Sequence, residues 1–185
     1  MEFDRQASEI IPGRLFLGNM RHGRSVGQGD NSQNITHVLN VSDQLVLMPG
    51  MLESGVIAEW VPIQDDGSDD IFGPPQEEGD YARACEDSGA IVPRSGAWWQ
   101  CRAFLHQAMS QEAGRILVHC ALGVNRSATI VIAWLMETMR WPVKEAFEYV
   151  EERRPIVGPV ERHMQQLDEF QIHLKIRDKR ACAVQ

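Results

Sequence analysis

Short apolar runs alternate with longer segments of helical periodicity along this chain. Short apolar runs typical of strands occur at 35–41, 59–63 and 116–118, and residues 10–18 indicate a turn that leads into a short strand. Apolar positions recur every three or four residues at 98–109, 127–140, 142–152 and 160–176, which predicts helices there. The polar residues of segment 127–140 fall mainly at its ends, so we expect this helix to be central and buried.

Strands that alternate with helices indicate the α/β class. We expect a single domain over residues 1–185, with a central, mainly parallel sheet flanked by helices. In open sheets of this class, ligands bind at the carboxyl ends of the strands.

Two segments interrupt the regular pattern. Residues 20–34 contain three glycines among polar residues, which is poor helix material, and we interpret this segment as a flexible loop. Residues 66–96 form an acidic insertion broken by glycines and prolines, in which Tyr81–Cys85 could form a helical turn. The insertion is either a lid that shapes substrate entry and favours basic flanking sequence, or a solvated, partly disordered loop.

Composition narrows the classes of partner. The net charge of −8 argues against general binding to nucleic acid or to an anionic membrane, and we expect neither partner. No secretory signal or long apolar run is present, so a soluble protein is expected. The four cysteines show no CxxC pair and no Cys/His metal spacing, which predicts no metal site.

One stretch carries recognisable chemistry. The run 116–118 leads into His119-Cys120, five residues separate Cys120 from Arg126, and a helical pattern follows. A strand, a tight loop and a helix N-terminus in this order place backbone N–H groups and the positive end of the helix dipole around one point, which favours phosphate. The same groups favour the thiolate of Cys120 and make it a nucleophile; a buried structural cysteine is the alternative.

A second candidate group lies upstream. Asp65 follows the run 59–63 in a polar turn, where a carboxylic acid can deliver a proton to a leaving oxygen. Its neighbour Asp66 is the alternative acid, and both residues could instead cap the turn.

The Cys-x5-Arg loop, with His119 before it and Ser127 after it, resembles the signature of cysteine-based protein phosphatases, and most closely that of the small dual-specificity phosphatases. Residues 11–19, 35–42 and 153–167 resemble the same family. The resemblance implies a protein-tyrosine-phosphatase-like fold, Asp65 as general acid, a loop-orienting role for His119, and no cofactor. The loop residues that would bind phosphate are Ala121, Leu122, Gly123, Val124, Asn125 and Arg126.

The expected reaction is hydrolysis of phosphotyrosine and phosphoserine/threonine in a phosphoprotein partner, through a phosphocysteine intermediate. Ser127 would donate a hydrogen bond that helps the sulfur leave. An active thiolate requires a reducing compartment, which indicates the cytosol or nucleus. The sequence gives no indication of oligomeric state.

Three alternatives remain open. Asn125 resembles the residue of RNA 5′-triphosphatases at this position, so an RNA 5′-phosphatase is one alternative, and a non-catalytic phosphate-binding module is another. Within the phosphatase interpretation, Arg153-Arg154 at the end of a predicted helix either complements the helix dipole or binds substrate phosphate directly.

Overall fold

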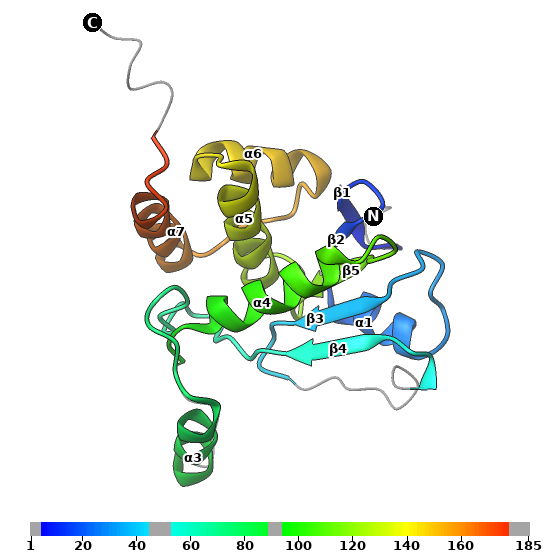
Figure 1. The fold of residues 1–185 in the computed structure, drawn as a ribbon, viewed down its shortest axis with the longest axis horizontal. Helices are drawn as coiled ribbons and strands as arrows, with labels where there is room; N and C mark the ends of the chain where they lie inside the picture. The colour runs from blue at the N-terminus through cyan, green and yellow to red at the C-terminus, as the bar shows by residue number, and fades with distance from the viewer. Residues whose placement is uncertain (1–4, 45–52, 89–93, 178–185) are drawn as a thin grey trace, which may run out of the picture.

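The computed structural model describes residues 5–44, 53–88 and 94–177, and its centre is a five-stranded sheet (Figure 1). The strands are β1 (Ser8–Ile11), β2 (Leu15–Gly18), β3 (His37–Asn40), β4 (Ile57–Trp60) and β5 (Ile116–His119), in the spatial order β1-β2-β5-β3-β4. Only β1 runs antiparallel to its neighbour, β2; the other pairs are parallel. The mainly parallel sheet expected from the sequence is confirmed, and β5, the strand that precedes Cys120, lies at its centre.

Helices cover both faces of the sheet. The helices of the described residues are α1 (Met20–Gly27), α3 (Glu78–Ser88), α4 (Ala97–Ser110), α5 (Arg126–Met139), α6 (Val143–Arg153) and α7 (Glu161–His173), of which α3 lies away from the sheet (Figure 1). Side chains of β5 alternate between two cores, because successive strand residues point to opposite faces. Ile116 and Val118 join the larger core under α4 and α5, whereas Leu117 joins a smaller core that includes Val26 of α1. In the described part of the chain, no helix combines the length and the apolarity needed to cross a membrane.

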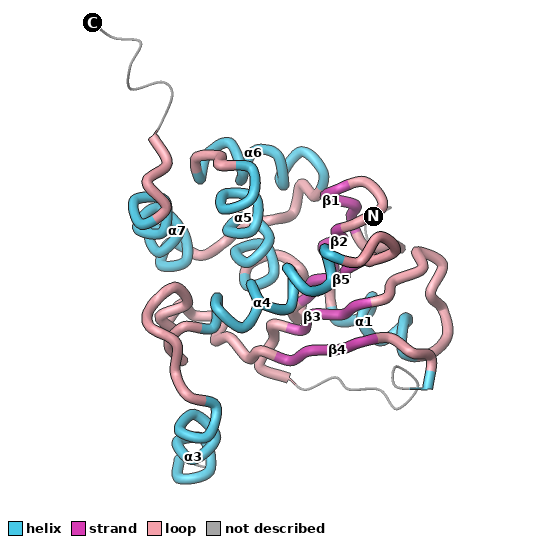
Figure 2. The backbone as a smooth tube through the Cα atoms, in the orientation of Figure 1, coloured by secondary structure: helices cyan, strands magenta, loops and turns pink. Residues whose placement is uncertain are grey.

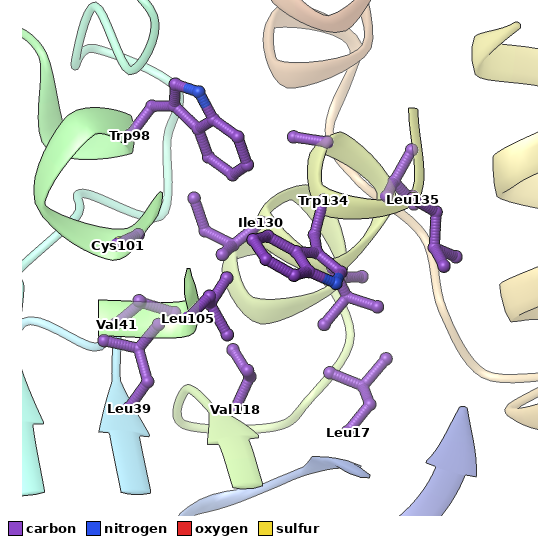
Figure 3. Packing of buried hydrophobic residues seen from close by; sticks show 14 of the residues in the cluster. Leu17, Leu39, Val41, Trp98, Cys101, Leu105, Val118, Ile130, Trp134 and Leu135 are labelled. Carbon is purple, nitrogen blue, oxygen red and sulfur yellow. The ribbon is translucent and has the colours of Figure 1, made fainter. Parts of the chain in front are cut away.

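The larger core surrounds α5, as the sequence predicts. Every residue of this helix from Arg126 to Met136 is buried. Figure 3 shows Ile130 of α5 among side chains of the sheet, including Val118, and of α4, including Leu105. The buried thiol of Cys101 belongs to this core, and burial raises the pKa of that thiol. The helix that follows the Cys-x5-Arg loop is therefore fixed by packing along most of its length.

Helix α1 contradicts the prediction of a flexible loop at residues 20–34. The side chain of Asn19 accepts hydrogen bonds from the backbone of Arg21 and His22, and the His22 side chain bonds back to the Asn19 backbone, which forms a capping box. Gly23, which weakens an isolated helix, lets α1 approach the sheet: a Cβ there would lie 2.5 Å from Nε2 of His119. Glycine therefore serves close packing here rather than flexibility.

The insertion at 66–96 divides into two parts. Its base packs against the core: Ile71 is fully buried, and the ring of Phe72 stacks on Phe170 of α7 at 4.5 Å. Gln166 of α7 bonds to the backbone at Asp69 and Ile71. The remainder contains α3, which is longer than the helical turn predicted there and extends away from the sheet in Figure 1. Residues 89–93 lie outside the described part of the chain, and the lid role stays a prediction.

Candidate active site

The loop after β5 leads directly into α5 at the carboxyl edge of the sheet (Figure 2). Cys120 follows the last residue of β5, and α5 begins at Arg126. The Cys120 sulfur accepts hydrogen bonds from the Gly123 N–H and the Ser127 hydroxyl, each at 3.2 Å, and the residue is 2% exposed. Two donors and a helix N-terminus therefore stabilise negative charge on this sulfur.

The carbonyl groups of the loop accept hydrogen bonds from groups outside the loop. Four successive carbonyls, those of Ala121, Leu122, Gly123 and Val124, each accept a hydrogen bond from a group beyond the loop. The donors are Met20 N (3.1 Å), Arg154 Nη2 (3.2 Å), Arg154 Nε (2.7 Å) and Gly158 N (2.9 Å), respectively. In a trans peptide the C=O and the next N–H point in opposite directions. The N–H groups of residues 122–125 therefore face the other side, where the N–H of Gly123 bonds to Cys120, and they form an anion-binding nest.

Arg154 supports this nest from behind. Its side chain is fully buried, and Nη1 also lies 3.3 Å from Oγ of Ser8. It therefore binds loop carbonyls rather than substrate phosphate, which corrects the direct role considered from the sequence. Arg153 instead stacks over the ring of Tyr149 at 3.4 Å and donates to the Tyr149 carbonyl. Glycine is required at position 123, where the loop passes close to Gly18, since its φ is +69° and a Cβ there would lie 2.4 Å from the Gly18 carbonyl oxygen.

Arg126 lies between two carboxylates. Its Nη1 donates to Oδ1 of Asp43 at 2.7 Å and to the Ile63 carbonyl at 3.1 Å. Its Nε lies 2.9 Å from Oδ1 of Asp65, which is close enough for an ion pair although the N–H is not aligned for a hydrogen bond. The guanidinium is only 3% exposed, so these contacts fix its direction. Asp43 and Asp65 follow β3 and β4, whose carboxyl ends meet at this edge of the sheet.

The two neighbouring acids of the turn have different surroundings. Asp65 faces the loop, where Oδ1 also accepts a hydrogen bond from Nδ2 of Asn125 at 2.9 Å. Asp66 faces its own turn, where Oδ1 accepts from the Ser68 N–H, and hydrogen bonds from Ser68 lower the pKa of Asp66. A lowered pKa makes a carboxyl a poorer proton donor near neutral pH. The geometry therefore places Asp65, not Asp66, beside the anion-binding nest.

His119 lies beneath the loop and is fully buried. Its Nδ1 is 3.3 Å from the carbonyl oxygen of Cys120, and α1 packs against the ring at Gly23. Burial lowers the pKa of His119 to about 4, so the imidazole is neutral at pH 7. A neutral ring without access to solvent favours the loop-orienting role over proton transfer with substrate.

Two residues at this site were not singled out from the sequence. Asp43 could have been found, because it lies just beyond a predicted strand that neighbours β5. His163 of α7, whose Nδ1 lies 2.7 Å from Oδ1 of Asn125, gives no local signal in the sequence. Among the described residues, no three His, Cys, Asp or Glu side chains gather in a way that could hold a metal ion.

Comparisons with known proteins agree with this geometry. Residues 98–173 match the family model described as "Dual specificity phosphatase, catalytic domain". "Dual specificity protein phosphatase Mpk3" of Drosophila melanogaster is 36% identical over 171 residues, which are 91% of this chain and 35% of that protein. "Dual specificity protein phosphatase 2" of Homo sapiens is 32% identical over 88% of this chain and 43% of that protein. The chain thus spans less than half of the length of these curated relatives.

Solved structures give the same result for the fold. The crystal structure of human DUSP28 superimposes with a TM-score of 0.65 and 26% identity, over 91% of this chain and 95% of that one. The crystal structure of a mouse putative dual specificity phosphatase complexed with zinc tungstate gives a TM-score of 0.64 and 27% identity, over 91% of this chain and 88% of that one. Sequence and structure together show that the chain belongs to the dual-specificity phosphatase family.

Proposed function

We propose that this chain hydrolyses phosphotyrosine and phosphoserine/threonine in proteins through a phosphocysteine intermediate. The observation that carries the proposal is the anion-binding nest. Because the loop carbonyls bond to groups outside the loop, successive N–H groups face one point, and the same loop holds Cys120 and Arg126. An array of fixed donors of this kind stabilises the charge of a phosphoryl group in transfer.

In the first step the Cys120 thiolate attacks phosphorus, so that an S–P bond forms while the P–O bond to the leaving oxygen breaks. The N–H groups of the loop and Arg126 bind the other three phosphate oxygens. Asp65, in its protonated form, gives its proton to the leaving oxygen, which departs as the free hydroxyl of the dephosphorylated side chain.

In the second step water attacks the phosphocysteine. The Asp65 carboxylate takes a proton from the water, the P–S bond breaks, and inorganic phosphate forms. The Ser127 hydroxyl, 3.2 Å from the sulfur, donates a hydrogen bond to the thiolate as it leaves. Each group used in the first step is thereby restored, and no cofactor enters the cycle.

The substrate is proposed to be a phosphoprotein, in keeping with the names of the relatives as protein phosphatases. A thiolate enzyme needs a reducing compartment, so we place it in the cytosol or nucleus. The sequence signal for an RNA 5′-phosphatase was Asn125, and its side chain bonds within the protein, to Asp65 and His163, instead of standing free for a nucleotide. The chain's net charge of −8 also disfavours an RNA substrate.

The test is phosphate release from a panel of phosphotyrosine, phosphoserine and phosphothreonine peptides and an RNA 5′-triphosphate. We expect turnover of the peptides by the wild type and none by Cys120→Ser. Preferred turnover of the RNA end would replace the protein substrate with a nucleic acid. Tight phosphopeptide binding without turnover by the wild type would leave only the non-catalytic binding module.

A further inference from the structure

Asn125 uses its whole side chain to join three separate parts of the site. Its Nδ2 donates to the Asp65 carbonyl oxygen at 2.8 Å and to Asp65 Oδ1 at 2.9 Å. Its Oδ1 accepts from the Val160 N–H at 3.0 Å and from Nδ1 of His163 at 2.7 Å. A carboxamide has two N–H donors and two acceptor lone pairs, so this buried side chain has no bonding capacity left.

Backbone partners fix which way the amide points. The Asp65 carbonyl can only accept and the Val160 N–H can only donate, so the nitrogen must face Asp65 and the oxygen must face α7. His163 must then carry a proton on Nδ1. Its other nitrogen, Nε2, is buried with no hydrogen-bond partner among the described residues, so the bond to Asn125 is the polar contact that this ring supplies.

This arrangement is not the ordinary use of asparagine at the start of a helix. Asn125 is the N-cap residue of α5, where asparagine is favoured because its side chain can accept a hydrogen bond from the first turn. Here the side chain makes no such bond. It turns away toward Asp65, and the N–H groups of the first turn of α5 keep their direction toward the phosphate-binding loop.

The link differs from the other contact that holds Asp65. The ion pair with Arg126 uses a group that must also bind the phosphate, so an incoming substrate competes with Asp65 for it. The Asn125 amide is neutral and binds Asp65 through both main chain and side chain. It therefore keeps its contacts with Asp65 when a phosphoryl group occupies the loop, and it does so from the same loop that carries the nucleophile.

We propose that Asn125 is a positioning residue, which holds the general acid Asp65 over the phosphate-binding loop during turnover, with Val160 and His163 setting the orientation of its amide. The inference rests on the proposed function, because it assigns Asn125 a part in proton delivery to the leaving group. A residue that acts only through Asp65 must affect substrates according to how much they need that proton.

The experiment compares substrates with different leaving groups. An ester of the acidic p-nitrophenol needs little protonation, whereas phosphotyrosine and phosphothreonine peptides need more. For Asn125→Ala we expect kcat/KM to fall about 10- to 100-fold on the peptides and less than about 3-fold on p-nitrophenyl phosphate. Asp66→Asn changes a carboxyl of the same turn that has no bond to Asn125, and should leave the ratio between the substrates unchanged.

A double-mutant cycle separates positioning from general loosening of the fold. In an Asp65→Asn background, Asn125→Ala should cause little further loss on the peptides, since the group it positions is already absent. A multiplicative loss, or an equal fall on all substrates in the single variant, would refute the inference. The proposed function would survive that result, because it is tested separately, by phosphate release from the phosphopeptides by the wild type.

A pair of variants at His163 keeps the test valid if Asn125→Ala does not fold. Asparagine at this position retains a donor close to that of Nδ1, and the lost Nε2 made no hydrogen bond. We expect His163→Asn to keep the wild-type ratio between substrates and His163→Leu to shift it in the same direction as Asn125→Ala. Equal ratios in the two variants would contradict the role assigned to His163.

Discussion

Arg154 offers the sharpest structural prediction, because it supports the phosphate-binding loop without facing it. Methionine at this position keeps the unbranched stem of the side chain but removes the guanidinium and its bonds to the carbonyls of Gly123 and Leu122. A hydrogen bond from a charged donor contributes roughly 1.5–3 kcal/mol, so the two bonds to the loop carbonyls together contribute at most about 6 kcal/mol. Loss of the guanidinium also removes its own desolvation cost, which brings the expected decrease in the free energy of unfolding to about 2–4 kcal/mol.

Activity should fall with stability, for a separate reason. The two carbonyls hold the following N–H groups toward the phosphate, and displacement of catalytic groups by about 1 Å can cost a factor of about 100 in rate. Urea unfolding and kcat/KM on a phosphotyrosine peptide measure the two effects. Arg154→Lys should be intermediate, since an ammonium cannot reproduce the two-pronged contact.

Arg153→Met is the matched control. This neighbouring arginine has a partly exposed side chain that stacks on Tyr149 and bonds to the Tyr149 carbonyl, away from the loop. We expect a loss below about 1 kcal/mol and wild-type kcat/KM. If Arg154→Met were as stable and as active as this control, the hydrogen bonds to the loop carbonyls would not be what shapes the anion-binding nest.

Three further predictions concern the acid, the buried histidine and the insertion. Asp65→Asn should lower kcat on phosphothreonine peptides by about 100-fold or more, while Asp66→Asn leaves kcat unchanged; the reverse pattern would move the acid by one residue. Burial lowers the pKa of His119 from 6.5 to about 4, so the unfolded chain binds a proton at this histidine before the folded protein does as the pH falls. About 3 kcal/mol of stability, which is fully present above pH 6.5, should therefore be lost progressively between pH 6.5 and pH 4. Urea unfolding of His119→Asn should show a correspondingly flatter pH dependence. Replacement of residues 77–92 by a short Gly-Ser linker should leave the unfolding midpoint near that of the wild type and, if the lid prediction holds, reduce the preference for basic flanking residues. An unchanged preference in the shortened chain would reject the lid. In contrast, Ile71→Ala should lower the free energy of unfolding by about 2–4 kcal/mol, because Ile71 is fully buried.

The sequence predicts what is local in this molecule and what a single chemical motif requires. The β-branched run before Cys120 and the apolar segment after Arg126 predict a strand, a loop and a buried helix, and the structure contains all three. The strand predicted at 59–63 lies instead at Ile57–Trp60. Val61 still donates to the Asn40 carbonyl, but Pro62 has no N–H and ends the pairing.

Features that depend on contacts between distant segments were not accessible from the sequence. Helix α1 was missed because the benefit of Gly23 lies in its approach to His119, which is far away along the chain. The base of the insertion looked like loop, yet Ile71 is fully buried in the core. The role of Arg154 was open because a basic residue near a phosphate site can face either the ligand or the backbone that binds it.

The central claim is that Cys120 forms a covalent bond to phosphorus. The direct measurement is rapid denaturation of the enzyme at alkaline pH during steady turnover of a phosphotyrosine peptide, followed by peptide mapping in a mass spectrometer. We predict a phosphoryl group on Cys120 of the wild type, and no label and no turnover in Cys120→Ser, which should still bind the phosphopeptide. Steady hydrolysis by Cys120→Ser free of contaminating phosphatase, or turnover by a wild type whose Cys120 is never phosphorylated, would contradict the account.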